Sequence, residues 1–362
     1  MSAEIRYRSG RFSYRNGRPF WPLGGFYVNL MQTELPITVD TLMGNTPMQR
    51  ATPVERAAYF RTLASRGVNA LRMFCRVHET IDGHPADLPL DIAGHVHPEI
   101  WRVMDTVLQD GCRYGIRFLV TLFAEPRASA YSHWAPWSAG IDSYRRNRWS
   151  FNRFMSDNPA DRKLLTSYSE YFTDPETIAL QTQYLRELAP LLRNHPAVFA
   201  VEIYNEQAWE GFFQWEAQDA EIAWTRRMVD LWRTLCPEKP VCYSLAGHGI
   251  VGIDPIRWSL GIQPDFFSSH IYPGACADNE RLDYGGMTAL VHDYSAAAGP
   301  NWPGEAGALM PAAGGHEERR RRALRDLIWL TVTSGGAGFM QWPMDRQPRE
   351  HLQEYRQALI LL

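Results

Sequence analysis

Residues 198–207 read VFAVEIYNEQ, and this stretch is the best guide to the fold. Its run 199–205 is apolar apart from one glutamate and the final asparagine, which is typical of a strand covered on both faces of a parallel sheet. The run ends on Asn205, and Glu206 follows directly. The preceding segment, 174–194, has helical spacing and begins at an Asp-Pro pair, so the stretch completes a helix-strand unit.

The same unit recurs along the chain. Short apolar runs lie at 20–27, 68–74, 117–123, 199–205, 240–244, 266–270, 301–305 and 337–342. Helical segments between them lie at 53–66, 98–114, 174–194, 216–236 and 317–334. Eight strand-helix steps in order predict an α/β protein with a (β/α)8 (TIM) barrel, formed as a single catalytic domain over residues 1–362.

The beginning of the chain separates the barrel from its main alternative, a doubly wound open sheet. That fold binds phosphate at a Gly-rich turn after its first strand. Residues 23–26 read LGGF and lack the G-x-G-x-x-G spacing, so the barrel is favoured. Residues 5–19 alternate in polarity around an Asn16-Gly17 turn, which predicts an N-terminal β-hairpin that closes the bottom of the barrel.

The composition excludes several classes of protein. The 362 residues are 45% hydrophobic and 21% charged, with a net charge of -3 that gives no reason to expect a nucleic-acid partner. No apolar stretch is long enough to span a membrane, and the N-terminus lacks a signal-peptide core, so we expect a cytoplasmic protein. The five cysteines have no C-x-x-C spacing, which predicts reduced thiols. Aromatic residues reach 12%, which favours a carbohydrate ligand because aromatic faces stack on sugars.

The longest interruption of the pattern follows the third strand, at residues 125–173. It is rich in aromatic residues and includes Trp134, Trp137 and Trp149. Such a composition disfavours disorder, and loops of this length in a compact domain are usually functional. We expect a folded insertion beside the active site whose tryptophans contact the ligand. The alternative is a small core that only covers a helix.

Catalytic residues of a (β/α)8 barrel come from the C-terminal ends of its strands. Two of the expected strand ends carry a glutamate, Glu206 on the fourth and Glu305 on the seventh, roughly across the barrel mouth from each other. Glycoside hydrolysis requires such a pair, one carboxyl group as proton donor and one as nucleophile. A single glutamate at a strand end is more often a helix cap or an ion-pair partner, so the prediction depends on the pair.

The residues around this pair resemble those of clan A glycoside hydrolases, the retaining cellulase- and mannanase-type barrels of family 5. The resemblance covers roughly residues 11–345 and follows the order of the strands. Its matches are Arg72 in NALRMF, Asn205-Glu206 in VEIYNEQ, His270-x-Tyr272, Glu305 in GPNWPGEAG, and Trp342.

The resemblance implies catalytic roles for two residues. Glu206 would be the general acid/base, and Glu305 would be the nucleophile. Arg72 would lie beneath Glu305, where its positive charge favours the ionised carboxylate. Tyr272 would hold Glu305, and His270 would lie near Glu206.

The resemblance also implies how the sugar is bound and where this chain departs from the family. Asn205 would bind the sugar 2-hydroxyl, and Trp342 would form the floor of the subsite for the reacting sugar. The family commonly has proline where this chain has Gln207, and many members have a histidine where residues 123–125 read FAE. These two departures leave the subfamily and the sugar open.

One further carboxylate has a structural explanation. Side chains alternate along a strand, so we expect Glu202, Tyr204 and Glu206 on one face. With Glu206 at the mouth, Glu202 lies deeper in the barrel, where a carboxylate is costly unless it is paired. Arg72, pointing inward from the second strand, is the expected partner of Glu202.

Other groups of residues compete with the glutamate pair. His95-Val96-His97 resembles the metal pair of amidohydrolase barrels, but it precedes a helix and does not end the first strand, so we expect no metal. His78-Glu79 follows the second strand, and the sequence favours equally a place lining the cleft and a capping role. Glu125 is either a substrate contact or the ion-pair partner of Arg127.

These observations predict a retaining β-glycosidase that hydrolyses β-linked glycosides or oligosaccharides by double displacement, without metal or cofactor. The alternatives are an endo-acting β-mannanase or β-glucanase and, from another class, a non-catalytic carbohydrate-binding barrel. We expect exo action or trimming of small oligosaccharides, because the insertion narrows the groove and a cytoplasmic enzyme meets few polymers. The sugar, the oligomeric state and any continuation of the natural chain past Leu362 stay open.

Overall fold

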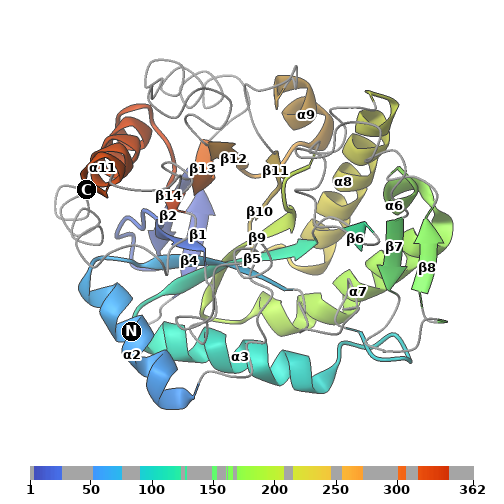
Figure 1. The fold of residues 1–362 in the computed structure, drawn as a ribbon, viewed down its shortest axis with the longest axis horizontal. Coiled ribbons are helices and arrows are strands. Elements are labelled where there is room, and N and C mark those ends of the chain that lie inside the picture. The colour runs from blue at the N-terminus through green and yellow to red at the C-terminus, as the bar shows by residue number, and fades with distance from the viewer. Residues whose placement is uncertain are drawn as a thin grey trace.

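The structure is a computed structural model that describes residues 4–26, 52–75, 90–123, 127–128, 149–152, 160, 162–165, 169–207, 215–245, 255–271, 301–306 and 317–341. Its centre is a parallel β-sheet surrounded by helices (Figure 1). The strands of this sheet are β3 (Leu23–Phe26), β4 (Ala70–Phe74), β5 (Arg117–Phe123), β9 (Val198–Tyr204), β10 (Val241–Cys242), β11 (Ser244–Leu245), β12 (Phe267–Ile271), β13 (Asn301–Ala306) and β14 (Phe339–Gln341).

The sheet closes into a barrel at its fifth strand. The hydrogen-bonded order is β10-β9-β5-β4-β3-β14-β13-β12-β11, with every neighbouring pair parallel. Only Tyr243 separates β10 from β11, and the two are halves of one strand: β10 pairs with β9, and β11 pairs with β12. The eight apolar runs therefore form the eight strands of the predicted (β/α)8 barrel.

Helices surround the barrel as the alternating pattern requires (Figure 1). They are α2 (Pro53–Ser65), α3 (Pro98–Arg113), α6 (Glu170–Thr173), α7 (Pro175–Arg193), α8 (Trp215–Leu235), α9 (Pro255–Ile262) and α11 (Glu317–Thr333). Helix α2 begins at a capping box, in which the Thr52 hydroxyl accepts from the Glu55 N–H and the Glu55 carboxylate accepts from the Thr52 N–H. Among the described residues, no helix has the length and apolar character needed to cross a membrane.

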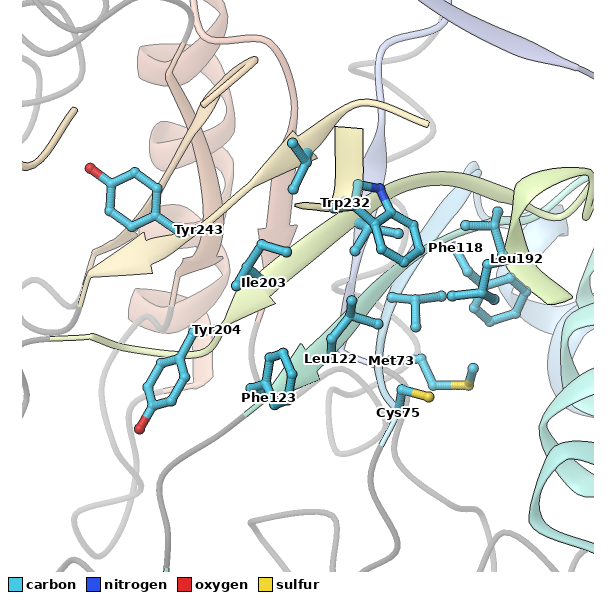
Figure 2. Packing of buried hydrophobic residues seen from close by; sticks show 14 of the residues in the cluster. Met73, Cys75, Phe118, Leu122, Phe123, Leu192, Ile203, Tyr204, Trp232 and Tyr243 are labelled. Atoms are coloured by element: carbon cyan, nitrogen blue, oxygen red, sulfur yellow. The ribbon is translucent and has the colours of Figure 1, made fainter. Parts of the chain in front are cut away.

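The main core lies between the strands and the helices. Figure 2 shows part of it, with Phe118 and Leu122 of β5 near Leu192 of α7 and Trp232 of α8. Each of these four side chains is almost completely buried. Burial of one such side chain contributes roughly 1.5–3 kcal/mol, so this layer holds the helices on the barrel and fixes the positions of the strand ends.

The N-terminal hairpin fills the bottom of the barrel, as predicted. Strands β1 (Ile5–Arg8) and β2 (Arg11–Tyr14) are antiparallel, and Phe12 packs edge-on against Phe199 and Phe266 at ring-centroid distances of 5.3 Å. The predicted turn at Asn16-Gly17 is confirmed by antiparallel pairing of Ser13 with Pro19, but the turn between β1 and β2 lies earlier in the chain. The two strands are joined at Ser9-Gly10, where both residues have positive φ (49° and 78°), as a two-residue type I′ turn requires.

The pair Asn16-Gly17 forms a second turn, directly after β2. The Gly17 N–H donates to the Tyr14 carbonyl, and the Asn16 side chain accepts from the Arg18 N–H. This turn follows the hairpin and returns the chain toward Phe20, which packs on Phe199 at 5.4 Å. Both turns have a dipeptide signal in the sequence, Ser-Gly for the first and Asn-Gly for the second.

The LGGF segment of β3 has a packing explanation. A Cβ atom at Gly24 would lie 1.7 Å from the carbonyl oxygen of Ala70 on the neighbouring strand. Glycine is required at position 24 because the two backbones approach so closely. Gly24 therefore serves the packing of β3 against β4.

Part of the insertion after the third barrel strand forms a small sheet of its own. Strands β6 (Arg127–Ala128), β7 (Trp149–Asn152) and β8 (Arg162–Leu165) pair antiparallel in that order. Lys163 connects this sheet to α7 through Asp174 at 2.6 Å and Glu176 at 3.0 Å. Trp134 and Trp137 lie outside the described residues, so their contact with a ligand stays a prediction.

Candidate active site

Glu206 occupies the C-terminal end of β9, at the barrel mouth. Its carboxyl oxygen Oε1 lies 3.0 Å from Nδ1 of His270 on β12, so the predicted proximity of the two residues is confirmed. The His270 side chain is fully buried, whereas that of Glu206 is 15% exposed. A carboxyl group held by a buried imidazole but open to solvent on one side can exchange a proton with a ligand in the mouth.

A buried ion pair lies deeper in the barrel, below Glu206. The Arg72 guanidinium donates to Glu202 Oε2 through Nε at 2.8 Å and Nη2 at 2.5 Å, and Thr121 Oγ1 donates to the same oxygen at 2.5 Å. Arg72 and Glu202 are both fully buried. The predicted pairing is confirmed, and it makes Glu202 a structural charge. The side chain of Glu305 lies outside the description, so the place of Arg72 beneath it stays a prediction.

The same arginine orients Asn205. Its Nη2 group also donates to Asn205 Oδ1 at 2.5 Å, and Asn205 is only 3% exposed. Arginine has no acceptor, so this contact assigns the amide oxygen to the arginine side and leaves the amide nitrogen to donate elsewhere. Arg72 thus connects the structural carboxylate Glu202 to the asparagine that the family resemblance assigns to sugar binding.

The prediction that Tyr204 shares a face with Glu202 and Glu206 is wrong. The Tyr204 ring packs edge-on against Trp224 of helix α8 at 5.7 Å, while Asn205 joins Glu202 on Arg72. Figure 2 shows Tyr204 beside Phe123 at this end of the core. Strict alternation thus fails between Glu202 and Tyr204, and beyond Tyr204 the chain leaves the strand, with Glu206 in a left-handed conformation at φ 51°.

The strand end around Glu206 is held by both neighbouring strands. The Asn205 N–H donates to the Phe123 carbonyl of β5 at 3.0 Å, and the Gln207 N–H donates to the Ser244 carbonyl of β11 at 2.9 Å. Between them, the Glu206 N–H donates to the Ser244 hydroxyl at 2.9 Å. A left-handed conformation costs a non-glycine residue roughly 1–3 kcal/mol, so these contacts maintain a strained backbone.

Gln207, which stands where the family commonly has proline, is completely buried. Its side-chain nitrogen donates to Thr225 Oγ1 of helix α8, and Thr225 in turn donates to the Glu221 carbonyl. A proline could supply neither this contact nor the backbone N–H that bonds to Ser244. The departure from the family pattern therefore ties the active-site strand to α8.

The backbone of Glu305 lies on β13, in register with His270 of β12. Adjacent strands are about 4.8 Å apart, so the backbone of Glu305 lies beside that of His270. Tyr272 and Trp342 lie outside the described residues, as do the rival candidates His78, Glu79 and Glu125. Their roles, and the separation of the Glu206 and Glu305 carboxyl groups, stay predictions.

The competing residues that the structure describes have other partners. His95 Nδ1 lies 3.1 Å from Glu187 of α7, in an exposed position away from the strand ends. In the described ranges, no three His, Cys, Asp or Glu side chains are grouped as metal ligands would be. Cys75, Cys112, Cys236 and Cys242 are free thiols, and burial raises the pKa of Cys75 to about 12, which disfavours a reactive thiolate there.

Two residues of the site were not predicted from the sequence. Thr121 points into the barrel from β5 and bonds to Glu202, and Ser244 bonds to the backbone of Glu206. A signal existed for Ser244, because it ends the apolar run 240–244, where a barrel strand carries functional residues. Nothing in the local sequence distinguishes Thr121 from other residues of a buried strand.

Known proteins resemble this chain in structure but not measurably in sequence. No family model and no curated protein matches it. An exo-β-1,4-mannosidase from Opitutaceae bacterium strain TAV5 superposes with a TM-score of 0.62 at 18% identity, covering 97% of this chain and 57% of that one. A glycoside hydrolase family 5 mannosidase from Rhizomucor miehei gives 0.62 at 13% identity, over 99% and 98%. An endo-β-1,4-mannanase from Thermotoga petrophila gives 0.62 at 15% identity, over 94% and 77%.

These likenesses confirm the predicted fold, a (β/α)8 barrel of the kind found in family 5 glycoside hydrolases. The chain spans little more than half of the Opitutaceae exo-mannosidase but nearly all of the Rhizomucor mannosidase. At sequence identities of 13–18%, these likenesses show a shared fold and nothing beyond it.

Proposed function

We propose that this protein is a retaining β-glycosidase with Glu206 as its general acid/base and Glu305 as its nucleophile. The observation that carries the proposal is the contact between Glu206 and His270 at the mouth of the barrel, with Glu305 in register beside His270 on the next strand. A partly exposed carboxyl group fixed by a buried histidine is suited to donate and accept a proton. A helix cap or a surface ion pair would not need such a partner.

The proposed reaction is a double displacement. Glu206 protonates the leaving oxygen while Glu305 attacks the anomeric carbon, which forms a glycosyl-enzyme ester. Glu206 then removes a proton from water, and the resulting hydroxide equivalent releases the sugar from Glu305. Asn205, oriented by Arg72, donates from its amide nitrogen to the sugar, a contact that strengthens in the transition state.

For the substrate we propose β-linked mannosides as the first class to test. The support comes from the solved structures that share the fold, which include a β-1,4-exo-mannosidase, a family 5 mannosidase and an endo-β-1,4-mannanase. Between exo and endo action we propose exo cleavage or trimming of short oligosaccharides, because the insertion after the third strand, with its own small sheet, adds mass next to the barrel. An endo-acting mannanase is the alternative.

A panel of aryl β-glycosides, with the mannoside first, tests the activity. Turnover of at least one of them supports an enzyme, and no turnover of any would favour the non-catalytic sugar-binding barrel. Glu305→Ala should abolish turnover and regain it with azide, which gives a glycosyl azide of inverted configuration. Glu206→Ala should retain the first step only for substrates with good leaving groups, because these need no proton. The reverse pattern would exchange the two roles.

The mode of cleavage is tested on a soluble mannan. Exo action releases monosaccharide while the viscosity of the solution falls slowly. A rapid fall in viscosity before reducing sugar accumulates would show endo cleavage and contradict the preference for exo action. The Glu305→Ala variant is the control, since it should change neither quantity.

A further inference from the structure

The backbone of Glu206 is held by the hydroxyl group of a residue on the neighbouring strand. Ser244 Oγ accepts a hydrogen bond from the Glu206 N–H at 2.9 Å and donates to the Tyr204 carbonyl at 3.3 Å. A single buried hydroxyl therefore contacts the turn on both sides of Asn205. We propose that Ser244 is a positioning residue that sets the Glu206 carboxyl group for proton transfer, an inference that rests on the proposed glycosidase function.

The contact at Glu206 differs from those of its neighbours in sequence. The N–H groups of Asn205 and Gln207 donate to main-chain carbonyls, which any residue at the partner positions supplies. The N–H of Glu206 donates to a side chain, so its acceptor depends on the identity of residue 244. Of these three N–H contacts, the one to the Ser244 hydroxyl is therefore the contact that a substitution of its acceptor can remove.

The conformation of Glu206 explains why this contact matters. Its φ of 51° lies in the left-handed region, which a residue with a Cβ atom adopts only when its surroundings enforce it. The direction of the Cα–Cβ bond depends on φ, so relaxation to negative φ would swing the carboxyl group away from His270. His270 restrains the carboxyl end at 3.0 Å, and Ser244 restrains the backbone.

A misplaced acid has a specific kinetic consequence. Substrates with poor leaving groups need a proton in the first step, whereas substrates with good leaving groups do not. Loss of the Ser244 hydroxyl should therefore slow the first group selectively. A general loss of folded protein would slow both groups equally, because each kcat/KM scales with the fraction of active enzyme.

The test compares Ser244→Ala with a matched control, Ser268→Ala. Ser268 lies opposite Ser244 in the register of β11 and β12, is also fully buried, and its hydroxyl has no hydrogen-bond partner within the described structure. The quantity measured is the ratio of kcat/KM for a 2,4-dinitrophenyl glycoside to kcat/KM for the phenyl glycoside of the same sugar. It should rise about tenfold or more in Ser244→Ala and stay at the wild-type value in Ser268→Ala.

The outcomes separate this inference from the proposed function. A wild-type ratio in Ser244→Ala, in an enzyme where Glu206→Gln changes it, overturns the role of Ser244 alone. A wild-type ratio in Glu206→Gln overturns the proposed function, and the inference with it. A crystal structure of Ser244→Ala gives a readout independent of activity: we expect Glu206 to adopt negative φ and to leave His270. Retention of both features would overturn the inference.

Discussion

The two ends of the barrel are made by the same strands and yet are opposite in chemistry. At the bottom, Phe12 and Phe20 of the N-terminal segment pack edge-on against the rings of Phe199 and Phe266. At the mouth, a buried histidine holds a carboxyl group, and directly below it Arg72 and Glu202 form a fully buried ion pair that belongs to this end of the barrel. One strand, β9, supplies Phe199 near its start and Glu202 near its end.

The difference shows which end supplies stability. Each buried phenylalanine stabilises the fold by roughly 1.5–3 kcal/mol, without the need for a partner of fixed geometry. Each buried charge loses several kcal/mol of hydration free energy, and its partner offsets this loss only when the geometry is good. A buried ion pair therefore often stabilises the fold no more than an apolar pair of similar volume would. We infer that the bottom stabilises the barrel and that the mouth keeps its charges for orientation of the site.

Removal of one charge at the mouth should have the largest effect. Arg72→Met leaves the buried Glu202 carboxylate without its cation, and we expect the free energy of unfolding to fall by about 3–5 kcal/mol. The double variant Arg72→Met/Glu202→Leu removes both charges and should regain most of that loss. Its kcat/KM should remain at least about tenfold below wild type, because Asn205 has lost the donor that orients its amide.

Equilibrium denaturation in urea and hydrolysis of an aryl glycoside measure the two quantities. The comparison between the ends of the barrel breaks down if the double variant is as unstable as Arg72→Met. It also breaks down if the double variant hydrolyses the substrate as well as wild type does. Either result would give the charges at the mouth a structural role instead of an orienting one.

A cavity at the bottom should have a smaller effect, confined to stability. Phe12→Ala removes a ring that contacts both Phe199 and Phe266, and we expect a loss of about 3 kcal/mol. The folded fraction should keep its KM and its ratio of kcat/KM between good and poor leaving groups, since the rings that Phe12 packs against, those of Tyr7, Phe199 and Phe266, lie at the bottom of the barrel. A change in that ratio would mean that packing at the bottom reaches the catalytic end, contrary to the separation of the two ends.

The sequence predicted the strands and most helices well, because their signals are local. The run 117–123 is β5 with identical bounds, and the helix expected at 53–66 begins at the expected residue and ends one residue earlier. The pairing of Glu202 with Arg72 was predictable because a buried carboxylate needs a cation. Such predictions depend on one strand or one charge at a time.

Features that depend on neighbouring strands were not predictable in the same way. Tyr204 packs against Trp224 of a distant helix, and Ser244 matters only because the fifth strand lies beside the turn at Glu206. The fifth strand itself divides at Tyr243 to pair on both sides, and helix α9 was not expected. Each of these departures is caused by tertiary contacts of residues distant in sequence.

The smallest predicted effect concerns acid and belongs to the bottom of the barrel. His195, just before β9, accepts from the Ala197 N–H at Nδ1, and its Nε2 lies 3.1 Å from Asp105. Protonation of Nδ1 would break the first contact, and burial, aided by the charge of Lys239 and opposed by Asp105, lowers the pKa of His195. The folded protein therefore binds fewer protons than the unfolded chain, so this contribution to stability is complete above about pH 6.5 and declines as the pH falls below it.

His195→Asn keeps an acceptor for Ala197 but does not titrate and cannot reach Asp105. At pH 8 it should be less stable than wild type by about 1 kcal/mol, and the gap should narrow toward pH 5 in parallel urea titrations. A gap that is constant with pH would show that folding leaves the pKa of His195 unchanged, and a gap that widens in acid would show that folding raises it.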